Sequence, residues 1–222
     1  MTTRRDLEAL AEPPMDCALC PRLVAFREQN QASSPEWFNA PVPSFGDSGA
    51  RVLIVGLAPG LQGANRTGRP FTGDYAGDLL YGTLIHFGFA RGPYLADPGD
   101  GLQLVDCMIT NAVRCVPPQN KPTGAEAKAC RAFLRARVEA LAELRIIVAL
   151  GRVAHDNVAT ALGVKKSAVP FGHGAKHELP GRLTLIDSYH CSRYNTNTGR
   201  LTTEMFEAVF HAVQDELGKF KT

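Results

Sequence analysis

The sequence predicts an α/β fold in which helices cover both faces of a parallel sheet. Short apolar runs rich in β-branched residues alternate along the chain with longer segments of helical periodicity. This alternation favours parallel strands, because each helix returns the chain to the start of the next strand. The chain has 222 residues, 45% of them hydrophobic, which suffices for one well-buried domain. We therefore expect residues 1–222 to form a single domain.

Four apolar runs are predicted to be the strands. They are short, and most end at Gly or at polar residues, as buried strands do. The runs are Val52 to Val55, Met108 to Val113, Arg145 to Leu150 and Leu183 to Asp187.

Six segments carry the apolar spacing of helices. They are Asp6 to Leu10, Leu23 to Asn30, Asp74 to Tyr81, Gly124 to Leu144, Gly151 to Ala161 and Thr202 to Leu217. The Pro- and Ser-rich segment Ser33 to Ser48 is predicted to cross the molecule without regular structure, and Lys165 to Pro180 to be an irregular connection.

Charge and hydropathy indicate in which compartment the protein is expected and which partners it can have. A net charge of +2 neither indicates nor excludes nucleic acid, because phosphate binding needs a basic patch rather than a basic total. No apolar run has the length of a membrane span, and the first residues lack the apolar core of a secretory signal. The sequence therefore predicts a cytoplasmic protein with no membrane partner.

A Gly- and Pro-rich stretch, Gly56 to Asp74, follows the first strand. A long loop at the carboxyl end of a buried strand is where open α/β sheets place their ligand sites. We interpret it as the active-site loop, whose chemically specific residues are Asn65, Arg66, Arg69, Phe71 and Asp74. Each has a plainer alternative: Asp74 as a helix N-cap, Phe71 as a core residue, and the arginines as solvated side chains.

Four of the six cysteines suggest a metal centre. In a reducing cytosol cysteines are thiols or ligands more often than disulfides. Cys17 and Cys20 form a C-x-x-C pair, whereas Cys115 and Cys130 are separated by 14 residues. This asymmetric set fits a four-iron cubane cluster better than the repeated knuckles of a zinc ribbon. Tetrahedral zinc and four unrelated thiols stay open as alternatives, and Cys107 is expected to be plain core.

Several motifs together resemble a known family. They are Gly56-Leu-Ala-Pro-Gly60, Asn65-Arg-Thr-Gly-Arg-Pro-Phe-Thr-Gly-Asp74, Asn111-Ala-Val-Arg-Cys115, the four cysteines, and His190-x-Ser-x-x-Asn-x-x-Thr-Gly-Arg-Leu201. The combination resembles the iron–sulfur uracil-DNA glycosylases of the type-B, or family 5, branch, over nearly the whole chain. The resemblance implies a three-layer α/β/α domain around a four-stranded parallel sheet. It also implies a 4Fe-4S cluster and excision of uracil and related deaminated bases from DNA. Cys191 stands where the family usually has proline, and Gly60 where it often has alanine.

The chemistry of N-glycosidic hydrolysis assigns roles to these residues. The sugar becomes oxocarbenium-like while negative charge collects on the departing base, so the site needs an anion and a donor. Asp74 is the candidate anion, which would also orient or deprotonate the water, and His190 is the candidate donor to uracil O2. Asn111 would read the N3–H and O4 edge, and Phe71 would stack on a flipped-out base. Gly56 is also expected to be a base-binding residue.

Residues around this pocket are expected to contact DNA. Arg66, Arg69, Arg193 and Arg200 would bind phosphates, which positions DNA without reading its sequence. Tyr194 or Asn195 would enter the space vacated by the flipped nucleotide, although an ordinary surface loop is an equally good interpretation. The expected partner is damaged DNA, bound by a monomer at the nucleoid.

Further expectations concern the cluster and the substrate range. We expect the cluster to brace the N-terminal segment and the residues after Cys115 against the sheet; a redox role is the alternative. Gly60 lacks a side chain, so the pocket is expected to admit hypoxanthine and xanthine as well as uracil. Other interpretations are a uracil-only, family 4-like glycosylase, a non-catalytic iron–sulfur module that binds nucleic acid, and an iron–sulfur redox protein.

Overall fold

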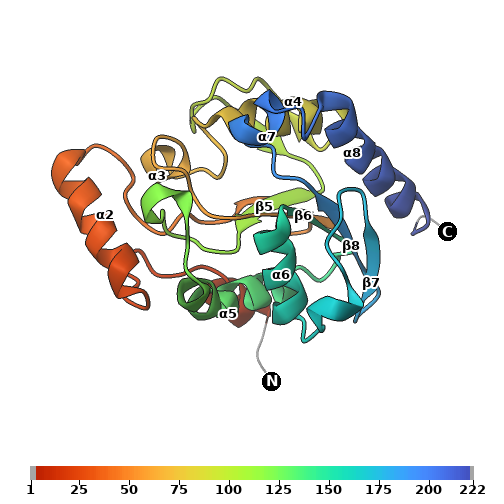
Figure 1. The fold of residues 1–222 in the computed structure, drawn as a ribbon, viewed down its shortest axis with the longest axis horizontal. Coiled ribbons are helices and arrows are strands. Elements are labelled where there is room, and N and C mark those ends of the chain that lie inside the picture. Colours follow the sequence, from red (N-terminus) through yellow and green to blue (C-terminus); the bar gives the residue numbers. More distant parts are fainter. Residues whose placement is uncertain (1–3, 221–222) are drawn as a thin grey trace.

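A sheet of six strands forms the centre of the molecule, in the order β1-β5-β2-β6-β8-β7. The computed structural model describes residues 4–220. Figure 1 shows helices α4, α7 and α8 on one side of the sheet and α5 and α6 on the other. Helices on both faces of a mainly parallel sheet confirm the predicted α/β fold. Within the described residues, each helix is too short or too polar to cross a membrane.

The four predicted strands form the parallel centre of the sheet. They are β2 (Val52–Gly56), β5 (Cys107–Asn111), β6 (Ile146–Leu150) and β8 (Leu183–Ser188). Neighbours among them pair in parallel, with Gly56 opposite Asn111 at the carboxyl ends of β2 and β5. Parallel strands end at one edge of the sheet, so the loops that follow them gather there.

Two antiparallel edge strands were not predicted. β1 (Phe45–Gly46) pairs with β5, and β7 (Lys176–Leu179) pairs with β8. Both lie in segments that were expected to be irregular. A strand of two residues and the polar run Lys-His-Glu-Leu have no apolar pattern from which a strand could be predicted. A separate two-stranded ribbon joins β3 (Ala90–Arg91) to β4 (Gln103–Leu104).

The six expected helices are all present, with ends that differ by a few residues. They are α1 (Arg4–Leu10), α2 (Pro21–Ser33), α4 (Tyr75–His86), α5 (Gly124–Ala140), α6 (Arg152–Ala161) and α8 (Thr203–Gly218). Two short helices, α3 (Ala64–Thr67) and α7 (Arg193–Asn197), occur where loops were expected. Helices of four and five residues are too short to show an apolar period.

Alternate side chains of each central strand fill two separate cores. In β2, Val52 and Ile54 pack on the side of α4 and α8, whereas Leu53 and Val55 pack on the side of α5 and α6. This alternation follows from the pleat, which sends successive side chains to opposite faces. The sheet is therefore buried on both faces, and its edge of carboxyl ends is left for the site.

Arg114, just beyond β5, ties the N-terminal segment to the sheet. Its side chain is 1% exposed. The guanidinium donates to the carbonyls of Val42 and Ala11 at 3.0 and 2.9 Å and to Ser44 Oγ at 2.8 Å. It also pairs with Glu12 at 3.0 Å. One buried cation therefore joins the segment after α1, the crossing segment and the end of β5.

Replacing Arg114 with alanine should lower the free energy of unfolding by about 3 kcal/mol, because breaking a buried pair leaves its partners without compensation. Urea denaturation measures the change. The control is Arg135→Ala, which removes an exposed pair with Glu139 and should change stability by less than about 1 kcal/mol. Equal shifts in the two variants would contradict the role given to Arg114.

Candidate active site

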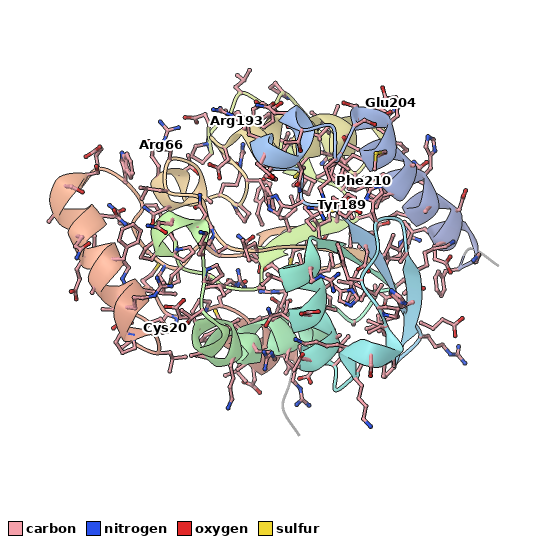
Figure 2. All side chains as sticks on the ribbon, in the orientation of Figure 1. Cys20, Arg66, Tyr189, Arg193, Glu204 and Phe210 are labelled. Atoms are coloured by element: carbon pink, nitrogen blue, oxygen red, sulfur yellow. The ribbon has the colours of Figure 1, made fainter. Side chains whose placement is uncertain are left out.

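A cavity of about 540 Å³ opens at the carboxyl ends of the parallel strands. Its walls come from the loop after β2, the end of β5, the turn between β6 and α6, and the segment after β8. They include Leu57, Ala58, Gly60, Phe71, Asp74, Tyr75, Asn111, Asn120, Gly151, Arg152, Val153, His190, Arg193 and Tyr194. In Figure 2, Arg66 and Arg193 project on the side of the molecule where α3 and α7 lie.

Asp74 points toward the glycines of the loop. It precedes α4, but its side chain makes no capping hydrogen bond, so the N-cap alternative is wrong. The carboxylate instead accepts the backbone N–H of Ala64. A Cβ at Gly60 would lie 2.5 Å from Asp74 Oδ2, and one at Gly63 would lie 2.0 Å from it. Both glycines are needed to make room for the carboxylate.

Burial raises the pKa of Asp74 above its ordinary value, against the opposing effects of the Ala64 N–H and the nearby Arg66. Burial acts in the opposite sense on His190 and lowers the pKa of its imidazole to about 4. The reason is the same in both cases: a poorly solvated site disfavours the charged form. At pH 7 His190 is therefore a neutral ring.

Asn111 and His190 both line the cavity, and each has a buried polar atom that is not hydrogen-bonded. Asn111 is the last residue of β5 and is 3% exposed. Among residues 4–220, neither Asn111 Oδ1 nor His190 Nδ1 has a hydrogen-bond partner, although both atoms are buried. Buried polar atoms are nearly always paired, so two such atoms on one cavity indicate a ligand that would pair with them.

Gly56 lies behind this wall and does not itself line the cavity. A Cβ at Gly56 would lie 2.4 Å from Asn111 Oδ1 and 2.6 Å from Phe71 Cζ. Its missing side chain therefore lets Asn111 and Phe71 approach each other. Phe71 belongs to the core and is 6% exposed, yet it also lines the cavity, and its ring lies stacked beside His190 at 5.8 Å between centroids.

The residues expected to contact DNA divide into two groups. Arg66, Arg193 and Arg200 are exposed, and the last two lie over the rings of Tyr75 and Tyr189 at 5.1 and 4.6 Å. Tyr194 is 72% exposed at the cavity mouth.

Two expected DNA contacts have other partners in the structure. Arg69 is 5% exposed and forms an ion pair with Asp100, so its guanidinium is not presented to a phosphate in this structure. Asn195 is half-buried, and its Nδ2 donates to the carbonyl of His190 at 2.8 Å. Its amide therefore positions the histidine, which leaves Tyr194 as the residue free to enter DNA.

Several residues on the cavity wall were not predicted as site residues, among them Asn120, Arg152 and Val153. Asn120 follows the Pro117-Pro118 turn with a left-handed φ of 56°, a conformation that asparagine tolerates better than most residues. Arg152 and Val153 begin α6. The start of α6 was predicted, and its position directly after a parallel strand could have indicated that these residues lie at the site.

The four candidate ligand cysteines line one recess. Cys17 and Cys20 come from the start of α2 and the turn before it, Cys115 from beyond β5, and Cys130 from α5. Burial, with a smaller contribution from neighbouring thiols, raises the pKa of Cys115 to about 12 and that of Cys130 to about 11. The backbone N–H of Arg114 donates to Cys130 Sγ at 3.3 Å. Cys107 is fully buried in β5, as expected of a core residue.

A second group of metal-binding residue types lies apart from these cysteines. Among the described residues, His155, His177 and Asp187 have ligand atoms within 4.8 Å of one another. Both ring nitrogens of His155 are already engaged, Nδ1 with Asp187 Oδ1 and Nε2 with the carbonyl of Val169, each at 2.7 Å. The hydrogen bond between His155 and Asp187 links α6 to β8.

Comparison with known proteins gives a consistent result. Residues 43–214 match the family described as the uracil DNA glycosylase superfamily. A type-5 uracil-DNA glycosylase of Thermus thermophilus is 49% identical over 90% of this chain and 94% of its own length. A type-5 enzyme of Pyrobaculum aerophilum is 40% identical over 92% and 90%, respectively. A type-4 enzyme of the same organism is 32% identical over 86% and 82%.

Proposed function

Because the chain belongs to the uracil-DNA glycosylase superfamily, we propose that it hydrolyses the N-glycosidic bond of uracil in DNA. The observation that carries the proposal is the pair of buried unpartnered atoms, Asn111 Oδ1 and His190 Nδ1, on two residues that line a cavity together with Asp74. A flipped-out base would supply hydrogen-bonding partners there, and a phosphate-only binding surface has no use for them.

Asp74 and His190 would carry the chemical step. As the glycosidic bond lengthens, positive charge develops on the sugar and negative charge on the base. The carboxylate of Asp74 would stabilise the sugar and orient the attacking water. The neutral ring of His190 would donate a hydrogen bond to the base oxygen, and no proton needs to leave it.

Asn111 and Phe71 would hold the base, and exposed residues around the cavity mouth would hold the rest of the DNA. The amide of Asn111 offers both an acceptor and donors, as the edge of uracil requires. The exposed cations Arg66, Arg193 and Arg200 would contact phosphates, and Tyr194 would fill the space left in the helix. Asn120 stands at the same mouth and would contact the flipped nucleotide.

Replacing Asp74 with asparagine or His190 with alanine should lower the single-turnover rate of uracil release about 100- to 1000-fold, because each removes a group aimed at developing charge. The assay uses a duplex with one uracil, treated with alkali to cut the abasic strand. The rate should rise with pH as Asp74 ionises. It should show no step near pH 6.5, since His190 is neutral above a pKa of about 4.

DNA binding by these two variants should stay close to that of the wild type. Wild-type protein that binds DNA without strand scission would identify a binding module. Near wild-type rates in both variants would reject the assigned roles.

We also propose that the four cysteines hold a 4Fe-4S cluster rather than a single zinc ion. Four sulfurs about 2.3 Å from one zinc would form a compact group, and among the described residues the compact group is the histidine–aspartate one instead. A cubane binds its thiolates through four separate irons, which needs wider spacing. When bound, such a cluster supplies a rigid cross-link, and redox chemistry is not required of it.

A cluster at this position would brace the active-site loop and the N-terminal segment. One small group of buried apolar side chains, which includes Leu23 and Val113, contacts Cys20, Cys115 and Ala58. Ala58 also lines the cavity. The backbone N–H of Val113 donates to the carbonyl of Leu57 at 3.0 Å. The cysteines that would hold the iron–sulfur cluster are thus separated from the cavity only by residues such as Ala58, which contact both.

Purified protein should be brown and contain about four iron and four sulfide per chain. Cys17→Ala should lose iron and the visible absorbance. Cys107→Ala, the matched control at a buried cysteine outside the recess, should keep both. A colourless protein that contains zinc and still releases uracil would exclude the cluster.

We also propose that the pocket accepts hypoxanthine and xanthine. A cavity of about 540 Å³ walled by Leu57 and Ala58 has no polar group at those positions to reject a larger base. Gly60 is not an open wall of the kind expected, because a side chain there would meet Asp74. Gly60→Tyr would displace the carboxylate and impair every substrate alike.

Wild-type protein should therefore excise all three bases from otherwise identical duplexes in single-turnover assays. Asn111→Ala should slow all three together, because one amide reads the similar carbonyl and N–H edge of each base. Release of uracil alone by the wild type would instead assign a uracil-only glycosylase.

A further inference from the structure

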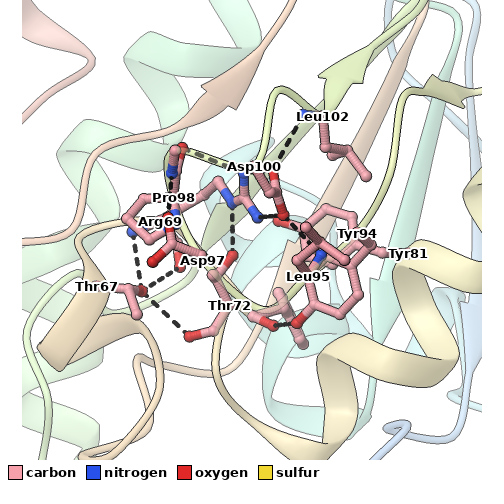
Figure 3. Close-up of polar contacts among 12 residues, drawn as sticks. Thr67, Arg69, Thr72, Tyr81, Tyr94, Leu95, Asp97, Pro98, Asp100 and Leu102 are labelled. Atoms are coloured by element: carbon pink, nitrogen blue, oxygen red, sulfur yellow. Dashed lines mark hydrogen bonds and ion pairs between the residues drawn. The ribbon is translucent and has the colours of Figure 1, made fainter.

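The ion pair between Arg69 and Asp100 is buried two residues from Phe71 (Figure 3). Arg69 Nη1 and Nη2 donate to the two oxygens of Asp100 at 2.8 Å each, and the two side chains are 5% and 0% exposed. Asp100 also accepts the backbone N–H groups of Leu95 and Leu102 at 3.0 Å. A bidentate pair with these supports fixes the orientation of the guanidinium.

This guanidinium and its neighbours hold the backbone that carries Phe71. Arg69 Nε donates to Thr72 Oγ1 at 2.7 Å. Three successive carbonyls each accept a side-chain hydroxyl: Pro70 from Tyr81 at 2.6 Å, Phe71 from Tyr94 at 3.2 Å, and Thr72 from Thr67 at 3.1 Å. The guanidinium also lies 5.5 and 5.9 Å from the rings of Tyr81 and Tyr94. The segment is therefore fixed from several sides.

Phe71 needs this support because its backbone is strained. Its φ is +55°, in the left-handed region that bulky residues rarely adopt. Such a conformation persists only where the surroundings impose it, and it is often found at functional sites. Here it turns the aromatic ring toward the cavity and toward His190.

We propose that the Arg69–Asp100 pair is a positioning element of the active site, which rests on the proposed function. The pair imposes the left-handed backbone at Phe71 and so presents the ring to the flipped base. Neither Arg69 nor Asp100 is among the residues that line the cavity, so both act through Phe71 rather than by touching substrate or phosphate.

Two variants test this role. The double variant Arg69→Met with Asp100→Leu removes the pair without leaving a lone buried charge, a replacement that is often neutral for stability. Tyr94→Phe removes only the hydroxyl that donates to the carbonyl of Phe71. The control is Arg51→Gln with Asp106→Asn, which breaks a pair of the same residue types that precedes β2 and β5, at the opposite end of the sheet from the cavity.

Single-turnover release of uracil by the double variant should fall about 10- to 100-fold, and release by Tyr94→Phe should fall in the same direction by less. Both variants should lose preference for a duplex containing uncleavable 2′-fluoro-deoxyuridine over an undamaged duplex. Affinity for undamaged DNA and its salt dependence should stay unchanged. The control should match the wild type in all of these measurements.

Three results would overturn the inference. One is a wild-type rate of uracil release by Tyr94→Phe. This variant tests the inference even if the double variant does not fold. Another is an equal loss of rate in the control. The third is a salt dependence weakened by about one phosphate contact, which would return Arg69 to the DNA surface. Absence of uracil release by the wild type would reject the proposed function itself.

Discussion

The parallel hydrogen-bonded ladder between β2 and β5 is the contact on which the site depends. Gly56 lies opposite Asn111 at its end, and the ladder continues into the loops, where Ala112 and Val113 donate to the carbonyls of Gly56 and Leu57 at 2.9 and 3.0 Å. The same backbone therefore positions the amide of Asn111 and the start of the loop that carries Asp74, and it leads on to the cysteine recess. Side chains from distant parts of the sequence meet there because parallel strands all end at one edge.

The geometry of the site depends on close packing as much as on its polar residues. Glycines 56, 60 and 63 stand where any Cβ would collide with Asn111, Phe71 or Asp74. The resulting burial moves two pKa values in opposite directions, upward for Asp74 and downward for His190. One poorly solvated cavity thus provides a carboxylate that costs free energy to keep ionised and an imidazole that stays neutral. That combination suits a reaction in which charge appears only in the transition state.

Burial also separates one of the four candidate DNA-binding arginines from the other three. Arg66, Arg69, Arg193 and Arg200 look alike in the sequence, since each lies in a loop rich in Gly or polar residues. Arg69 alone of these four is buried, because Asp100, 31 residues further on, accepts hydrogen bonds from both of its terminal nitrogens. Arg114 is a comparable case, in which a buried cation joins three segments that are remote in sequence. The local sequence around an arginine does not show its partner.

The sequence by itself determined the parallel α/β architecture, the four central strands and the six longer helices, because apolar periodicity is a local property of the chain. Its motifs also determined the loop in which Asp74 lies and the strand ends that carry Asn111 and His190. Only the tertiary structure decided the edge strands β1 and β7, whose pairing depends on β5 and β8 rather than on their own residues. It also decided the burial of Arg69, the left-handed backbone of Phe71 and the place of Asn120 on the cavity wall. These features arise from contacts between residues distant in sequence, and no local pattern records them.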